Sequence, residues 1–138
     1  MCGIVGIIGA GIPMGVIERM TAATAHRGPD SDGFFVEGDT HLGHRRLSII
    51  DTSERGRQPM VDASGRYVLI HNGEIYNYQQ LRAELEYPWQ TGTDTEVILA
   101  AYRQWGPACV ERFAGMFAFA IWDKVAQRLF IARDRLGI

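Results

Sequence analysis

Cys2 directly follows the initiator Met1, and this placement could make it a nucleophile. Cysteine is small enough for Met1 to be removed, which would put a thiol and a free α-amine on one residue. Because an α-amino group titrates at about pH 7.7 to 8.0, it can accept the proton of the thiol near neutral pH. Such a cysteine needs no histidine as its base. On position alone, Cys2 is more simply a small apolar residue that opens a strand.

The pair Asn72-Gly73 could stabilise the product of a nucleophilic attack. Thiolate attack on a carboxamide creates an oxyanion, which requires positioned hydrogen-bond donors. Asn72 offers a side-chain amide beside the sterically open backbone N–H of Gly73, so the pair could form an oxyanion hole. Considered in isolation, an Asn-Gly pair at a strand end is more often the turn of a hairpin.

Three charged residues, Arg46, Glu74 and Asp94, could bind a free amino acid that carries a side-chain amide. Its α-carboxylate requires a fixed cation, and its α-ammonium requires carboxylates. Each of the three could instead be a solvated surface charge. Asp94 could also be the N-terminal cap of the helix that it opens.

Hydrophobic periodicity predicts the elements that must position these residues. Strands are expected where β-branched and apolar residues cluster, and helices where apolar residues recur at helical spacing. The predicted strands are Cys2 to Ile8, Gly33 to Val36, His41 to Ile50, Arg66 to His71, Met116 to Asp123 and Arg128 to Asp134. The predicted helices are Pro13 to Ala23, Tyr78 to Leu85, Asp94 to Trp105 and Pro107 to Phe113.

The order of these elements indicates the fold class. Strands cluster near both ends of the chain while helices lie between them, which favours an α+β sandwich with antiparallel sheets over alternating βαβ units. The pair Asn72-Gly73 is predicted to reverse the chain after the strand that ends at His71.

Composition excludes several classes of protein. The 138 residues are 46% apolar and 22% charged, as expected for one globular domain. A net charge of −2 with interspersed signs argues against nucleic acid and anionic membrane as partners. The chain has no apolar run of about 20 residues and no basic signal region, so we expect it to be cytoplasmic. Cys2 and Cys109 lie too far apart for a thiolate metal motif or a disulfide framework.

Other motifs suggest weaker alternatives. The glycine-rich stretch 7–15 imitates a dinucleotide-binding loop, but its third glycine comes late and the acid Asp30 lies in a predicted turn. His41 and His44 could suggest a metal pair, yet residues three apart in a strand point to opposite faces. Cys109 has the spacing of a packed helical residue and is not expected to be a second nucleophile.

Taken together, seven segments of the chain closely resemble class II glutamine amidotransferases, in the same order. They are 1–6 (MCGIVG), 26–30 (HRGPD), 44–51 (HRRLSIID), 72–77 (NGEIYN), 93–98 (TDTEVI), 115–120 (GMFAFA) and 132–138 (ARDRLGI). The residues after Arg46 and the HRGPD stretch resemble the asparagine synthetase branch, not the hexosamine-forming or purine-forming enzymes. Segment 86–92 is shorter than the corresponding family loop.

The resemblance implies an N-terminal nucleophile hydrolase fold, which is a four-layer αββα sandwich with two stacked antiparallel sheets, here expected to lack its last strands. It implies that Cys2 attacks the side-chain amide of L-glutamine, while Asn72 and the N–H of Gly73 hold the oxyanion. The implied glutamine-binding residues are Arg46 for the α-carboxylate, and Asp94 with Glu74 for the α-ammonium.

The resemblance also implies how the released ammonia is used. Residues 1–138 correspond to a C-terminally incomplete glutaminase domain. Its partner would be a C-terminal synthetase domain, in cis or in trans, that uses ATP and Mg²⁺ to activate aspartate as the acceptor of the ammonia. The glutaminase domain itself is expected to need no cofactor or metal, and it could form a homodimer. Two alternatives remain open, namely an acceptor other than aspartate and a truncated non-catalytic remnant.

Overall fold

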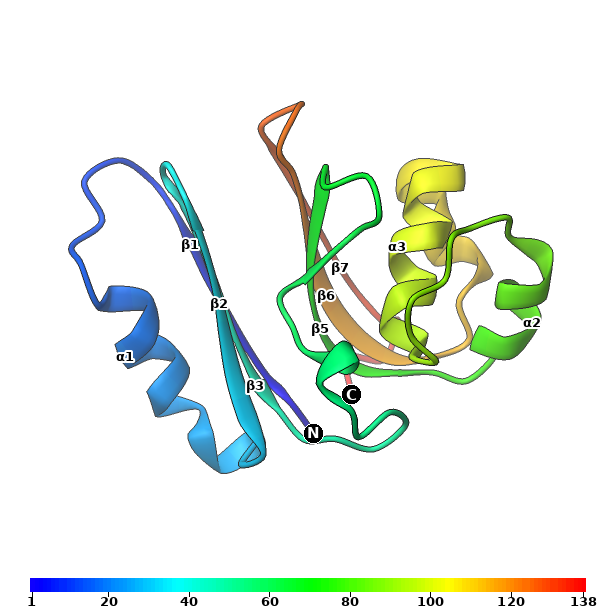
Figure 1. The fold of residues 1–138 in the computed structure, drawn as a ribbon, viewed down its shortest axis with the longest axis horizontal. Helices are drawn as coiled ribbons and strands as arrows, with labels where there is room; N and C mark the ends of the chain where they lie inside the picture. Colours follow the sequence, from blue (N-terminus) through cyan, green and yellow to red (C-terminus); the bar gives the residue numbers. More distant parts are fainter.

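The computed structural model describes residues 1–138, which form four layers in the order helix, sheet, sheet, helices (Figure 1). The first sheet has the strand order β1-β3-β2, and the second has the order β4-β5-β6-β7, with every neighbouring pair antiparallel. The strands are β1 (Gly3–Ile8), β2 (Ser31–Glu37), β3 (Thr40–Arg46), β4 (Met60–Val61), β5 (Tyr67–Ile75), β6 (Gly115–Asp123) and β7 (Arg128–Arg133). The predicted αββα sandwich of two antiparallel sheets is confirmed.

Helices cover the outer face of each sheet (Figure 1). Helix α1 (Val16–Ala23) packs on the first sheet, α3 (Asp94–Trp105) packs on the second, and α2 (Tyr78–Glu84) packs against α3. Short 3₁₀ helices cover Ala25–Arg27, Glu54–Gly56 and Gly106–Arg112. The larger core lies between α3 and the second sheet, and the buried thiol of Cys109 belongs to it. Cys109 is fully buried, so this cysteine is a packed side chain, as predicted, and burial raises its pKa to about 12.

Some predicted bounds differ from the structure; helix α1, for example, begins at Val16 and not at Pro13. The pair Asn72-Gly73 is not a hairpin turn, because β5 continues through it to Ile75 and stays paired with β6 along its whole length. The prediction of a tight turn is therefore wrong, because β6 supplies a partner for every residue of β5. The positive φ of Gly73 (137°) is accommodated inside the strand. Strand β3 ends at Arg46, not Ile50, because β1 and β2 provide no partners beyond it.

Two buried histidines connect the layers. His44 on β3 and His71 on β5 are 1% and 2% exposed, and Nε2 of His44 lies 3.1 Å from the backbone oxygen of His71. A smaller apolar cluster of Leu42, Val68 and Ile70 packs between the same two sheets. Mainly because the two rings are buried, the pKa of His44 is lowered to about 4 and that of His71 to about 3.

Because of these two histidines, we expect the folded protein to lose stability in acid. Both are neutral in the folded protein but titrate near pH ~6.5 when unfolded, so their contribution to stability is complete above that pH and is lost as the pH falls toward 4. We expect the free energy of unfolding to decrease by up to about 4 kcal/mol between pH 7 and pH 5. Urea titrations at the two pH values measure this. The variant His26→Gln, which removes an exposed imidazole, should behave like wild type, whereas His44→Gln should weaken the pH dependence. Equal stability of wild type at both pH values would contradict the assignment.

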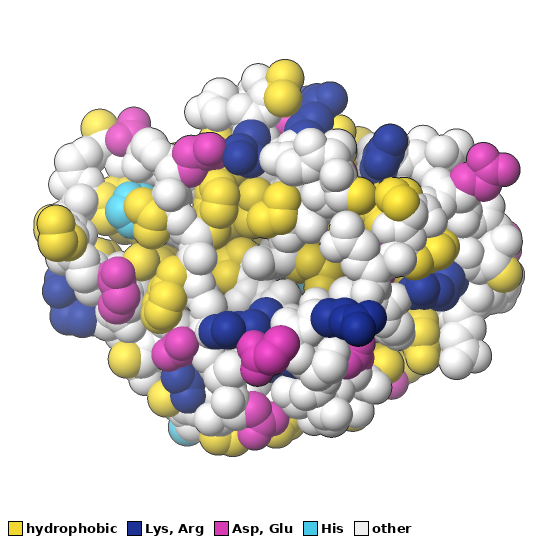
Figure 2. Space-filling model, viewed as in Figure 1, with side chains coloured by type: hydrophobic (Ala, Val, Ile, Leu, Met, Phe, Trp, Pro, Cys, Tyr) yellow, Lys and Arg dark blue, Asp and Glu magenta, His cyan; other side chains and the backbone are white.

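An apolar cleft of about 520 Å³ opens between the two sheets and is lined mainly by β1, β6 and β7. Figure 2 shows hydrophobic side chains gathered in a hollow near the middle of the face of the molecule that it displays. None of the helices combines the length and apolar character needed to cross a bilayer.

Candidate active site

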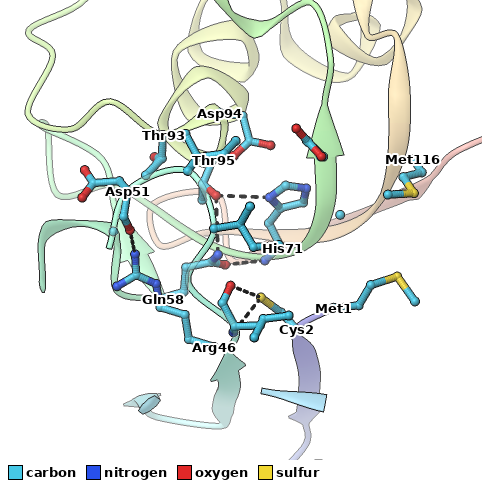
Figure 3. A pocket seen from close by; sticks show the side chains of 16 residues that line it. Met1, Cys2, Arg46, Asp51, Gln58, His71, Thr93, Asp94, Thr95 and Met116 are labelled. Atoms are coloured by element: carbon cyan, nitrogen blue, oxygen red, sulfur yellow. Dashed lines mark hydrogen bonds between the residues drawn. The ribbon is translucent and has the colours of Figure 1, made fainter. Parts of the chain in front are cut away.

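A pocket at one end of the sandwich collects residues from both sheets and from the start of α3 (Figure 3). Five of the six predicted site residues line it, namely Cys2, Arg46, Gly73, Glu74 and Asp94. In Figure 3, Asp94 lies on the upper side of the pocket, and Cys2 and Arg46 lie on the lower side. The pocket therefore unites distant parts of the sequence, from Met1 to Met116.

Cys2 stands just before β1, and its sulfur is held at the pocket wall. The backbone N–H of Leu47 donates to Sγ at 3.4 Å, and Sγ lies 3.7 Å from the oxygen of the same residue. The backbone oxygen of Cys2 accepts a hydrogen bond from Nε of Arg27 at 3.0 Å. Arg27, from the HRGPD segment, thus fixes the chain at the candidate nucleophile.

Met1 forms part of the same wall and is 51% exposed. With Met1 in place the pocket has a volume of about 90 Å³. Small-molecule sites usually exceed roughly 300 Å³. Removal of Met1 would enlarge the pocket on the side of Cys2 and would expose the α-amine beside its sulfur.

Strand β5 divides its side chains between two faces. Because side chains alternate along a strand, Asn72 and Glu74 share the face of Val68 and Ile70, which pack toward the first sheet, whereas His71 shares the opposite face with Leu69. The face that carries Asn72 is therefore the face toward Cys2. Asn72 does not line the pocket itself, and its buried Oδ1 has no hydrogen-bond partner.

Arg46 is 7% exposed, so it is not the solvated charge considered as an alternative. Its guanidinium donates to the backbone oxygens of Ser53 (2.7 Å) and Asp51. Gly56 packs against this group, since a Cβ there would lie 2.3 Å from Nη2 of Arg46. The loop that follows β3 thus fixes one cation at the pocket.

Asp94 is 5% exposed and is the first residue of α3. The helix cap is Thr93, whose side chain accepts from the N–H of Glu96, so the interpretation of Asp94 as the cap is wrong. Oδ2 of Asp94 accepts from the N–H of Ile75 on β5 at 2.9 Å. Burial raises the pKa of Asp94, and backbone hydrogen bonds from Ile75 and Thr95 oppose that rise. An ammonium group bound beside it would favour the carboxylate form.

Sequence reasoning missed a buried group in the wall of the pocket, formed by Gln58, His71 and Thr95. Oε1 of Gln58 accepts from the N–H of His71 at 2.6 Å, and Nδ1 of His71 lies 3.2 Å from Oγ1 of Thr95. His71 and Thr95 are direct neighbours of predicted site residues, which could have marked them. Gln58 has no such signal. No group of three or more His, Cys, Asp or Glu side chains could hold a metal ion.

The fold and the position of Cys2 define the class of the protein: an αββα sandwich with a cysteine just before its first strand is the arrangement of N-terminal nucleophile hydrolases. Two solved structures share this fold. The allosteric regulatory enzyme of purine biosynthesis matches 74% of this chain and 25% of its own, with a TM-score of 0.63 and 25% identity. Glutamine phosphoribosylpyrophosphate amidotransferase from B. subtilis matches 97% of this chain and 31% of its own, with a TM-score of 0.61 and 21% identity.

The family model of the glutamine amidotransferase domain matches residues 1–138, and the chain belongs to this family. It is 45% identical to the glutamine-hydrolyzing asparagine synthetase 1 of Bacillus subtilis, over all of this chain and 23% of that protein. It is 48% identical to the glutamine-hydrolyzing asparagine synthetase B of Escherichia coli, over 82% of this chain and 21% of that protein. The chain thus spans less than a quarter of the length of these two relatives.

Proposed function

We propose that this domain hydrolyses the side-chain amide of L-glutamine to glutamate and ammonia, with Cys2 as the nucleophile after Met1 is removed. The observation that supports it best is the single pocket lined by Cys2, Arg46, Gly73, Glu74 and Asp94. A cysteine with a free α-amine supplies nucleophile and base, and the charged residues match the two ends of an amino acid.

The reaction proceeds in two halves. The α-amine of Cys2 takes the thiol proton, and Sγ attacks the amide carbon of glutamine to give a tetrahedral oxyanion. The side-chain amide of Asn72 and the N–H of Gly73 donate to that oxyanion. As the carbon–nitrogen bond breaks, the proton passes to the leaving nitrogen and ammonia departs. Water then attacks the glutamyl thioester, which releases glutamate and restores the thiol.

Glutamine recognition follows from the charges at the pocket. Arg46, fixed by loop carbonyls, binds the α-carboxylate, since a guanidinium can donate two parallel hydrogen bonds to it. One carboxylate oxygen of Asp94 accepts a hydrogen bond from the N–H of Ile75. The other oxygen of Asp94 and the carboxylate of Glu74 bind the α-ammonium. This arrangement selects a free amino acid over the same amide within a peptide chain.

The whole protein is proposed to pass its ammonia to an ATP-dependent synthetase domain, in cis or in trans. Its relatives in B. subtilis and E. coli are glutamine-hydrolyzing asparagine synthetases, so aspartate is the first acceptor to test. ATP and Mg²⁺ are proposed to act only on that synthetase domain, with no cofactor in residues 1–138.

Steady-state assays of glutaminase activity test this function. Purified protein without Met1 should release equal amounts of glutamate and ammonia from L-glutamine. It should discriminate against analogues that lack either the α-carboxylate or the α-ammonium. Equal rates with these analogues and with glutamine would contradict the proposed recognition.

The variant Arg46→Gln is expected to raise the KM for glutamine by about 100-fold with a much smaller change in kcat, because a buried cation for the α-carboxylate is lost. The matched control is Arg55→Gln, since Arg55 lies in the same loop, is exposed and uses only its backbone in hydrogen bonds. An unchanged KM in Arg46→Gln would show that the carboxylate binds elsewhere.

A further inference from the structure

Along the edge of β5 that faces away from β6, backbone N–H groups donate hydrogen bonds to side-chain oxygens. Strand β4 pairs with β5 no further than Leu69, so the later residues have no strand partner on that side. The N–H of His71 donates instead to Oε1 of Gln58 at 2.6 Å. The N–H of Ile75 donates to Oδ2 of Asp94 at 2.9 Å. Side-chain oxygens therefore replace the missing strand.

Gly73 lies between these two bonded positions on the same edge. In an antiparallel ladder the N–H groups of alternate residues point to the same side. The N–H of Tyr76 donates to Ala114 on the β6 side at 2.7 Å, so the N–H groups of residues 71, 73 and 75 point away from β6. Gly73 also lines the pocket. The proposed oxyanion donor is thus the middle member of a row whose outer members are held by Gln58 and Asp94.

Gln58 is well placed to fix this row. It is 7% exposed, and its Nε2 lies 3.5 Å from Oγ1 of Thr95, the second residue of α3. The backbone oxygen of Gln58 packs against Gly33 of β2, where an added Cβ would lie 2.0 Å from that oxygen. Gln58 thereby contacts the first sheet, the edge of β5 and the start of α3 together.

We propose that Gln58 is a positioning residue, which sets the direction of the Gly73 N–H by anchoring the neighbouring His71 N–H. This inference rests on the proposed function of Gly73 in stabilising the oxyanion. Without the acceptor, a buried N–H at His71 has no partner, and β5 must shift to reach another one. Because the oxyanion forms only during the reaction, such a shift lowers kcat and leaves glutamine binding nearly unchanged.

Two variants of one position test the proposal. Gln58→Leu removes the acceptor at similar volume, and Gln58→Glu keeps an oxygen at the same place. Gln58→Leu is expected to lower kcat by about 10- to 100-fold with KM within about twofold, since small misplacements of catalytic groups have effects of this size. Gln58→Glu should keep kcat within about threefold of wild type, as should the exposed-surface control Gln79→Leu. Wild-type kcat in Gln58→Leu, or an equal loss in Gln58→Leu and Gln58→Glu, overturns the proposal.

Amide hydrogen exchange separates this proposal from the proposed function. In Gln58→Leu the His71 amide should exchange at least about tenfold faster than in wild type, because its hydrogen bond is lost. The Ile75 amide, which Asp94 still accepts, should keep its rate. An unchanged His71 rate overturns the anchoring by Gln58 whether or not the protein hydrolyses glutamine. Absence of glutaminase activity in wild type overturns the proposed function instead.

Discussion

Replacing Cys2 with alanine is expected to abolish glutamine hydrolysis, with a fall in kcat of about 10⁴-fold or more, because no other nucleophile lines the pocket in a comparable position. Alanine is also small, so removal of Met1 should proceed as in wild type and the α-amine should remain. The loss can therefore be assigned to the sulfur. Ammonia release measured at saturating glutamine gives the effect directly.

The matched control is Cys109→Ala. This buried thiol lies in the core between α3 and the second sheet, so its loss should lower stability by about 1 kcal/mol while kcat stays near wild type. If Cys2→Ala retained the activity of wild type, Cys2 would not be the nucleophile.

The variant Gly73→Ala is expected to have the second largest effect, because it disturbs both the strand and the oxyanion donor. A Cβ at this position would lie 2.1 Å from the oxygen of Met116 and 2.6 Å from Cα of Phe117. Both atoms belong to the backbone of β6, and the φ of Gly73 is 137°. We expect a loss of about 3 kcal/mol in the free energy of unfolding and a fall in kcat of at least about 100-fold.

Gly92→Ala provides the control for this glycine. Gly92 lies in open space, with no atom within 4 Å of an added Cβ, so stability and kcat of Gly92→Ala should both stay near wild type. Chemical denaturation and steady-state kinetics on the two variants measure the effects. A Gly73→Ala protein as stable and as active as wild type would show that β5 does not require glycine there.

Elements with a continuous hydrophobic period could be predicted almost to the residue. Helix α3 has the predicted bounds, and β6 and β7 differ from the prediction by one residue each. Local sequence carries this information because apolar residues recur along each of these elements with the period of its secondary structure. The two-residue strand β4 could not be predicted, since it exists only through its pairing with β5.

The Asn-Gly pair shows where local propensity fails. Its composition is typical of a hairpin turn. In the structure, pairing with β6 keeps Asn72 and Gly73 inside β5, where the open backbone of Gly73 allows the close approach of Met116. Of the two residues predicted to form an oxyanion hole, Gly73 lines the pocket and Asn72 does not.

The five pocket residues could be predicted from their chemistry and the family resemblance, but their supports could not. Gln58 reaches His71 across 13 positions, and His71 reaches Thr95 across 24. Contacts of side chains over such separations depend on the packing of the two sheets and α3. No periodicity in the sequence encodes them.

Whether Cys2 is a nucleophile at a formed glutamine pocket can be measured by intact mass and peptide mapping after treatment with the glutamine analogue 6-diazo-5-oxo-L-norleucine. We expect a protein without Met1 that carries one adduct, located on Cys2, and no adduct in Cys2→Ala. Free L-glutamine should slow the labelling. A protein that has lost Met1 but acquires no adduct on Cys2 would show that Cys2 is not a nucleophile at a formed glutamine pocket.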